Sequence, residues 1–107
     1  MKAIKTTGKR TPWGVIEIEQ VIALYNEFLI NQLNGIKYSK AQPVRDCAAN
    51  IGRSKGSVEC KLMNISAIRN SNGLDIVKGY KPLDNAQKLL VDMVQLDIDS
   101  NRNRARG

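Results

Sequence analysis

The chain contains no histidine, only two cysteines and few aromatic side chains among its 107 residues. Without histidine, acid–base catalysis near neutral pH would fall to carboxylates, lysines or tyrosines, and the acidic residues form no paired constellation. Cys47 and Cys60 lack the close spacing and the partner ligands of a zinc site. No glycine loop of the phosphate-binding GxxxxGK[ST] type is present. We therefore expect no enzyme, no cofactor, no metal and no small-molecule substrate.

Long apolar runs are also missing. No stretch approaches the roughly 20 apolar residues of a membrane-spanning helix, and the basic start of the chain lacks the apolar core of a signal peptide. These absences predict a soluble, cytoplasmic protein. In such a compartment we expect Cys47 and Cys60 to be buried free thiols, with a disulfide as the alternative.

Positive charge is in excess, with a net charge of +7, and it is unevenly distributed. Residues 1–10 carry +4 and residues 101–107 carry +3, so the body of the chain is neutral. Within the body, residues 35–81 hold nine lysines and arginines against three acids. The flanking segments, residues 11–34 and 82–100, each have a net charge of −3. A basic middle between two acidic segments is typical of a one-sided surface for a polyanion, and an ordinary solvated surface is the alternative.

Apolar residues recur at three- and four-residue steps in four segments, which predicts an all-α fold of about four helices. The first helix should end at Asn34-Gly35 and the second at Gly52, because glycine suits a left-handed cap. Serine and aspartate are favoured where a helix begins. The expected helices span about residues 16–33, from the Ser39 cap to 51, from the Ser54 cap to 68, and from the Asp84 cap to about 99.

Between the third and fourth helices, residues 69–83 read as a long loop with a short extended piece at 75–78. The fourth helix should present a broad apolar face, part of which would meet a second subunit. That face is expected to comprise Ala86, Leu89, Leu90, Met93, Val94 and Leu96. Residues 1–12 are interpreted as a basic arm, 13–99 as the domain, and 100–107 as a basic tail or the start of a linker.

Residues 39–68 carry the functional argument. A helix that ends in Gly52, a short turn and a Ser-capped second helix are the layout of a helix-turn-helix. The N-terminus of the second helix would offer N–H groups and a partial positive charge to phosphate, and short residues there would let the backbone approach DNA. The candidate DNA-binding residues are Lys40, Arg53, Ser54, Lys55, Gly56, Ser57, Lys61 and Asn64.

Different roles are expected within this set. Arg53, Lys55 and Lys61 are assigned to phosphate, which positions a protein without reading sequence. A helical wheel with Val58 and Leu62 inward points Asn64 outward, where it would read an adenine edge. The wheel also places outward Gly56, Ser57, Cys60 and Met63. The alternatives are that Ser54 acts only as a cap, that Cys60 and Met63 belong to the core, and that Asn64 bonds backbone within its own subunit.

The run YSKAQPVRDCAANIGRSKGSVECKLMNISAI, followed by GLDIVKGYKPLDNAQKLL, resembles an N-terminal helical domain of phage, bacterial and mobile-element proteins. In those proteins it precedes a nuclease domain of the HNH or GIY-YIG type or a replication initiator. The resemblance covers about residues 13–95 and implies DNA targeting in a bacterial host cell. It also implies that an effector domain would begin about where this chain stops.

The sequence therefore predicts a sequence-specific domain for double-stranded DNA, such as a replication origin, acting as a homodimer on repeated or palindromic half-sites. The basic arm would enter a neighbouring minor groove, with a solvated end as the alternative interpretation. A helical protein–protein interaction module without DNA binding is the main alternative function. RNA binding is disfavoured because few aromatic residues are available for stacking on single strands.

Overall fold

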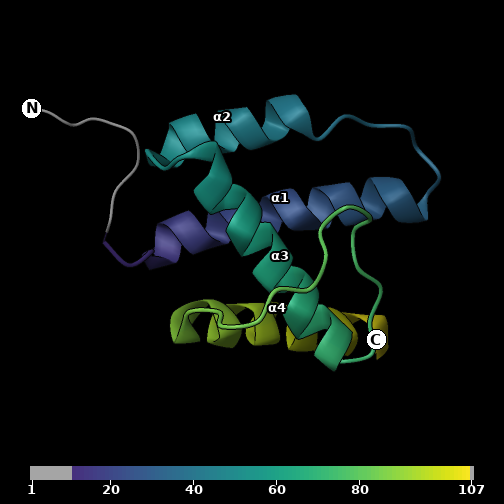
Figure 1. Ribbon diagram of the computed structural model, residues 1–107. Coiled ribbons are helices and arrows are strands. Elements are labelled where there is room, and N and C mark those ends of the chain that lie inside the picture. Colours follow the sequence, from purple (N-terminus) through teal and green to yellow (C-terminus); the bar gives the residue numbers. More distant parts are fainter. Residues whose placement is uncertain (1–10, 107) are drawn as a thin grey trace, which may run out of the picture.

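The computed structural model describes residues 11–106, with side chains placed up to Arg102. These residues form four α-helices and no strand, so the expected all-α fold is confirmed (Figure 1). The helices are α1 (Val15–Leu33), α2 (Ala41–Ile51), α3 (Lys55–Ser71) and α4 (Lys88–Arg106).

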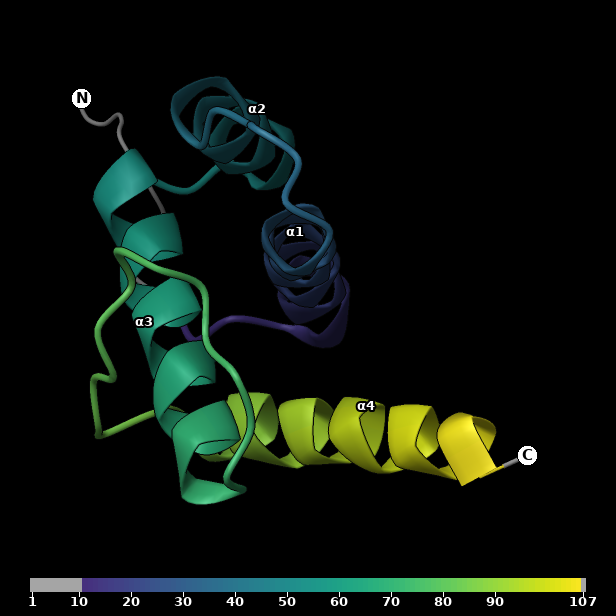
Figure 2. The same ribbon diagram turned by 90° about the vertical axis from the view of Figure 1, so that its right-hand side faces the viewer.

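Helices α1 and α3 are the central elements, because each of them contacts the other three helices. Helices α1 and α2 lie side by side and run in opposite directions, and α3 begins beside the end of α2 and crosses in front of α1 (Figure 1). In the view turned by 90°, α1 and α2 are seen end-on, whereas α4 extends across the picture at the far end of α3 (Figure 2). The start of α3 is therefore next to α2, and its end is next to α4.

All four helices contribute buried side chains to one core, and its largest fully buried side chains include Tyr25, Phe28, Leu62 and Leu90. The Tyr25 hydroxyl is satisfied there, because it shares a 2.8 Å hydrogen bond with the Ser66 hydroxyl and accepts the Val77 N–H. Burial of these apolar side chains contributes roughly 1.5–3 kcal/mol each. Trp13, just ahead of α1, is also buried.

The predicted bounds of α1 and the predicted start of α3 agree with the structure, because both depend on hydrogen bonds and backbone turns between nearby residues. Glu17 accepts the Gly14 N–H at 2.9 Å, which satisfies a donor at the start of α1. At the other end of α1, Gly35 has the left-handed φ of +67° that the predicted cap requires. The Ser54 hydroxyl accepts the Ser57 N–H at 3.1 Å, so the predicted cap of α3 is confirmed.

The predicted start of α2 is wrong by a residue. Its N-cap is Lys40, whose side chain makes no capping bond, and Ser39 is exposed. Gly52 ends the helix in the left-handed conformation at φ +69°, as predicted. The position of Lys40 is fixed by distant contacts of its ammonium group, described below, rather than by a local cap.

The predicted start of α4 is also wrong. Asp84 caps nothing, and the helix begins only at Lys88, so Ala86 lies before it. The cause is the segment that crosses α3, where the Leu83 N–H donates to the Met63 carbonyl. Asn85 then has a left-handed φ of +68°, which is incompatible with a right-handed helix, so α4 can begin only after it. No extended strand forms at residues 75–78, where Lys78 and Gly79 form a turn instead.

At its other end, α4 runs through the residues interpreted as a tail or linker, up to Arg106. No glycine or proline interrupts residues 88–106, and Gln95 donates to Asp99 one turn along the helix. Within the expected apolar face, Leu90 and Val94 are buried and Leu96 is 66% exposed, whereas Ile98, which was not among the expected residues, is also buried. The predicted arm falls almost wholly on residues 1–10, which lie outside the described residues.

Candidate nucleic-acid interface

Three residues, Gly52, Arg53 and Ser54, join α2 to α3. The left-handed Gly52 reverses the chain, and the Ser54 cap begins α3 immediately afterwards. Helices α2 and α3 are in contact, so a helix pair with a short turn is present at the predicted place. Its use as a DNA-binding helix-turn-helix stays a prediction.

The first turn of α3 is open to solvent. Lys55 and Gly56 are exposed, and a side chain at Gly56 would meet nothing within 4 Å. Lys55 has no hydrogen-bond or ion-pair partner among the described residues. Ser57 is half-buried and its hydroxyl accepts a 2.9 Å bond from Ser54. Two of the predicted residues, Lys55 and Gly56, are therefore accessible to a partner.

Further along α3, the outward side carries Cys60, which is exposed, and Glu59 and Met63, which are half-buried. The cysteines are free, with Cys47 buried and Cys60 exposed, so the expectation of two buried thiols is wrong for Cys60. Burial raises the pKa of the Cys47 thiol.

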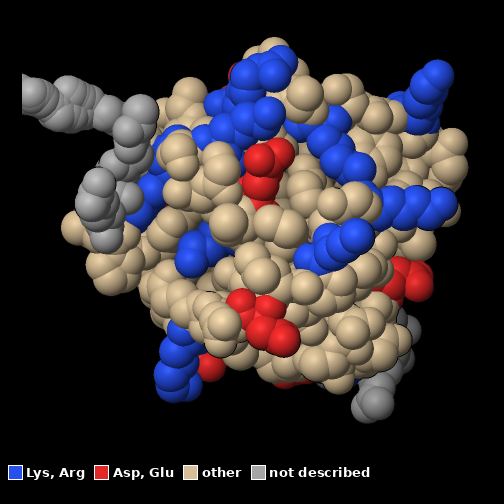
Figure 3. All heavy atoms as spheres, in the orientation of Figure 1, with Lys and Arg blue, Asp and Glu red and all other residues tan. Residues whose placement is uncertain are grey.

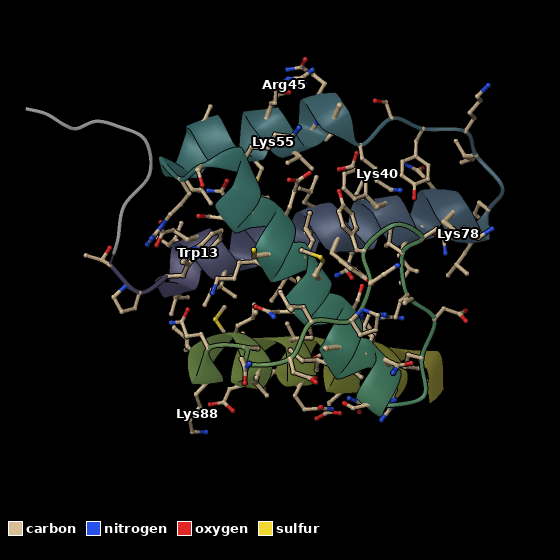
Figure 4. All side chains as sticks on the ribbon, viewed as in Figure 1. Trp13, Lys40, Arg45, Lys55, Lys78 and Lys88 are labelled. Carbon is tan, nitrogen blue, oxygen red and sulfur yellow. The ribbon has the colours of Figure 1, made fainter. Side chains whose placement is uncertain are left out.

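Lysines and arginines gather on the face that contains α2 and α3. Blue spheres cluster over the upper half of Figure 3, above α2 and the start of α3, with an acidic group among them. Figure 4 places Arg45 and Lys55 at this end, Lys40 and Lys78 beside it, and Lys88 at the opposite end on α4. Arg45 is exposed and donates to the Gln42 side chain at 2.9 Å.

Arg53 is not available to phosphate, which corrects its expected role. The residue is 6% exposed, and its Nε donates to Glu17 at 2.7 Å in an ion pair. Its other donors reach the carbonyls of Thr11 and Pro12. The sequence placed Arg53 on the surface because a lone arginine in a turn is usually solvated, whereas here Glu17 neutralises it from α1.

Lys61 is half-buried beside Arg53. Its ammonium lies 5.4 Å from the centre of the Trp13 ring, within the range of a cation–π interaction. Burial lowers the pKa of Lys61, and the neighbouring Arg53 charge lowers it further. Its predicted phosphate contact would need the side chain to leave Trp13, so we assign Lys61 mainly to the fold.

Lys40 also serves the fold. Its ammonium lies 5.9 Å from the Tyr38 ring centre and 5.4 Å from that of Tyr80, and it donates to the Lys78 carbonyl at 2.6 Å. Gly79 has a φ of +94°, and a Cβ there would lie 3.1 Å from the ammonium. Lys40 therefore ties the start of α2 to the loop that follows α3. Together with Lys55 and Glu59 it lines a shallow groove of about 250 Å³.

Asn64 is buried, so its predicted outward position is wrong. It is 6% exposed, and its Nδ2 donates to the Leu83 carbonyl at 2.6 Å. The helical wheel failed because α3 is covered on more than one side: helix α1 packs on one face, and the segment leading into α4 crosses another. The alternative interpretation, in which Asn64 bonds backbone of its own chain, is confirmed.

The residues that sequence reasoning missed are Arg45 and Lys78, which are exposed at or beside the end where the basic side chains gather (Figure 4), and Lys81, which is also exposed. The α2 pattern contained a signal for Arg45, because it follows the inward-facing Val44 by one residue. For Lys78 and Lys81 the charge excess of residues 35–81 was the only signal, since their loop has no periodicity.

No family model, curated protein or solved structure matches this chain. The resemblance to the targeting domains of phage and mobile-element proteins therefore stays a prediction. Among residues 11–106, no helix is long and apolar enough to cross a membrane. The same residues contain no group of three or more acidic or cysteine side chains placed to hold a metal ion.

Proposed function

We propose that this chain binds double-stranded DNA as a sequence-specific targeting domain, with the start of α3 directed into the major groove. The observation that carries the proposal is the open first turn of α3, where Lys55 and Gly56 are exposed next to the Ser54 cap. This turn lies at the end of the molecule where lysines and arginines gather (Figures 3 and 4), and a side chain at Gly56 would meet nothing within 4 Å.

The chemistry of this turn suits phosphate. The first N–H groups of a helix have no intrahelical acceptor, and Ser54 satisfies only that of Ser57. The N–H groups of Lys55 and Gly56 are left to donate to an anion, assisted by the helix dipole. Lys55 and Arg45 add positive charge at the same end of the molecule (Figure 4), and the missing side chain at Gly56 allows the backbone to come close.

In this proposal the DNA bases are recognised by side chains on the outward side of α3, after Gly56. Glu59 is the polar group there, in place of the buried Asn64, and it has no ion-pair partner among the described residues. A glutamate in the major groove accepts from the amino group of cytosine. Cys60 and Met63 offer smaller apolar contacts, of the kind that thymine methyl groups accept. The preferred site should therefore contain cytosine opposite Glu59.

A targeting role of this kind fits replication initiation at an origin or the direction of a nuclease, which are the uses implied by the resemblance. Binding as a homodimer would match repeated or palindromic half-sites. The targeting role and the homodimer are parts of the same proposal, which also implies a cytoplasmic location.

The test compares charge reversals on two ends of the molecule. Lys55→Glu and Arg45→Glu should each weaken binding to duplex DNA and reduce the salt slope by about 1 for each phosphate that is no longer neutralised. Lys88→Glu is the matched control, because it makes the same change of charge on α4, where Lys88 pairs with Asp92. The first two variants should lose affinity and the control should keep it, measured by fluorescence anisotropy. Equal affinity in all three would exclude the start of α3 as the DNA-binding surface.

One observation favours a protein-interaction module as a second candidate. Two open pockets of about 460 and 600 Å³ lie along α1 and α4 and share Asn26 and Asp97, and the larger one is also lined by Arg69 and Leu74. The exposed Ile30, Leu33 and Leu96 are among their lining residues. Exposed apolar side chains of this size often mark a protein interface. This candidate predicts self-association that Leu96→Glu abolishes, without any DNA binding, in sedimentation velocity.

A further inference from the structure

Among the described residues, helix α1 has one side that no other helix covers. In Figure 2, where α1 is seen end-on, α2, α3 and α4 lie around it and its right-hand side is open. Ile16, Ala23 and Ile30 recur on the exposed side of α1 at seven-residue steps, and Leu33 follows three residues after Ile30. Ile16 is 71% exposed, Ile30 57% and Leu33 59%. These side chains form an apolar strip along α1 that nothing in the described part of the chain buries.

The spacing of this strip is that of a helix that packs against a second helix. Glu19 lies three residues after Ile16 and Asn26 three residues after Ala23, so the positions alternate at steps of three and four. Such steps are the a and d positions of the heptad repeat, through which two helices pack along their length. Ala23 is small and stands near the middle, where it would let a second helix approach closely. We call this set the α1 stripe; it comprises Ile16, Glu19, Ala23, Asn26, Ile30 and Leu33.

Charges of opposite sign lie at the two ends of the α1 stripe. Glu19 is exposed near its start and has no ion-pair partner among the described residues. Near its end, the pocket that contains Leu33 is also lined by Arg69 and Arg102. Both arginines donate to backbone carbonyls of the chain after α3, and neither has an acidic partner in the described part of the chain. A surface with one acidic and one basic end is complementary to a second copy of itself that runs in the opposite direction.

We propose that two copies of this chain pair through the α1 stripe, with their α1 helices antiparallel. Aligning the a positions of one helix with the d positions of the other packs Ile16 against Leu33 of the second copy, and Ala23 against Asn26. The acidic end of each stripe then lies beside the basic end of the other. Two-fold symmetry repeats every contact, so association stops at the dimer.

The pairing leaves the candidate DNA interface uncovered. Figure 2 places α3 on the side of α1 that is opposite the open side, so Lys55 and Gly56 stay accessible in the dimer. Two copies would present two such interfaces, as repeated or palindromic half-sites require. This use of the dimer rests on the proposed function, whereas the pairing itself needs no DNA.

Sedimentation velocity of the full chain without DNA tests the pairing separately from the proposed function. The unmodified chain should shift from monomer to dimer as its concentration is raised. Ile30→Glu should keep it monomeric, because pairing would bury an unpaired carboxylate. Leu83→Glu is the matched control, since it makes the same kind of change at a leucine that is 42% exposed outside the stripe, and it should leave the dimer intact. Far-ultraviolet circular dichroism verifies that both variants fold.

A monomer at every concentration, or a dimer that Ile30→Glu does not weaken more than Leu83→Glu, would overturn the pairing. Either result would leave the proposed DNA binding to its own test, because no DNA is present. Charge exchange then tests the two ends of the stripe. Glu19→Arg and Arg102→Glu should each weaken the dimer several-fold, and the double variant should restore it, since opposite charges meet again. A double variant as weak as the single ones would overturn the antiparallel arrangement.

Cysteine substitutions along the stripe test the orientation of the two helices. The background is Cys60→Ser, which removes the exposed thiol. Ala23→Cys would lie near the two-fold axis and should form a disulfide between copies on mild oxidation. Ile16→Cys is the matched control, because in an antiparallel pair its two copies would be on the order of 25 Å apart at 1.5 Å per residue. Efficient cross-linking of Ile16→Cys, or none of Ala23→Cys, would overturn the proposal.

Discussion

At the scale of single residues, buried polar groups connect segments that are far apart in the chain. Asn64 of α3 holds the Leu83 carbonyl at 2.6 Å, Tyr25 of α1 holds the Val77 N–H, and Gln32 accepts the Lys78 N–H at 2.8 Å. These bonds fix the long segment between α3 and α4 against the other helices. Because the side chains of Asn64, Tyr25 and Gln32 are buried or half-buried, removing one leaves a polar backbone group without its partner.

Asn64→Ala should therefore lower the free energy of unfolding by about 1–3 kcal/mol, since it leaves the Leu83 carbonyl unsatisfied. Asn70→Ala is the control on the same helix, because Asn70 is exposed, and it should change stability by less than about 0.5 kcal/mol. Urea denaturation measures both. Equal stability of the two variants would show that the Asn64 bond contributes nothing.

Tyr80 should make the free energy of unfolding depend on pH in the alkaline range. Burial raises the pKa of Tyr80 to about 12, with further contributions from Glu59 and Tyr38. The folded state keeps the phenol protonated at a pH where the unfolded chain, with a pKa near 10, has released the proton. Stability should consequently fall as the pH rises from about 10 to about 12, and the fall should be smaller in Tyr80→Phe. Thermal unfolding at pH values of about 9 and about 11 would check this, and identical slopes in both proteins would contradict it.

At the scale of helices, the sequence predicts where a helix begins when the capping side chain bonds a backbone N–H a few residues away, as Ser54 does. Ser54→Ala removes the bond to the Ser57 N–H and should lower the free energy of unfolding by about 1 kcal/mol. Ser57→Ala is the matched control, since it leaves the capping bond in place. Guanidinium denaturation compares the two, and a loss in Ser57→Ala as large as that in Ser54→Ala would argue against the cap.

The four helices differ in how well their starts could be predicted from the sequence. Helices α1 and α3 were placed well because their apolar steps and their start or stop signals are local. Ser39 and Asp84 failed as caps because the starts of α2 and α4 depend on contacts made across the fold, by Lys40 with the tyrosines and by Leu83 with α3. Arg53 failed for the same reason, since its partner Glu17 is 36 residues away.

At the scale of the whole molecule, charge and apolar surface are on different sides. The basic face belongs to α2, the start of α3 and the loop near Lys78 (Figure 4), whereas the open pockets with exposed apolar lining residues lie along α1 and α4. Sequence alone predicted the charge excess of residues 35–81 but not which cations remain accessible. Folding uses Arg53, Lys40 and in part Lys61, and leaves Lys55 and Arg45 exposed.

The central claim is that this face binds DNA, and salt dependence tests it most directly. Affinity of the unmodified chain for duplex DNA should fall linearly on logarithmic axes with a slope of about −3 or steeper, because each phosphate neutralised contributes about −0.9. A duplex selected from a random library should bind more tightly than unselected DNA at every salt concentration. No binding at the lowest salt, or binding that is insensitive to salt, would contradict the account.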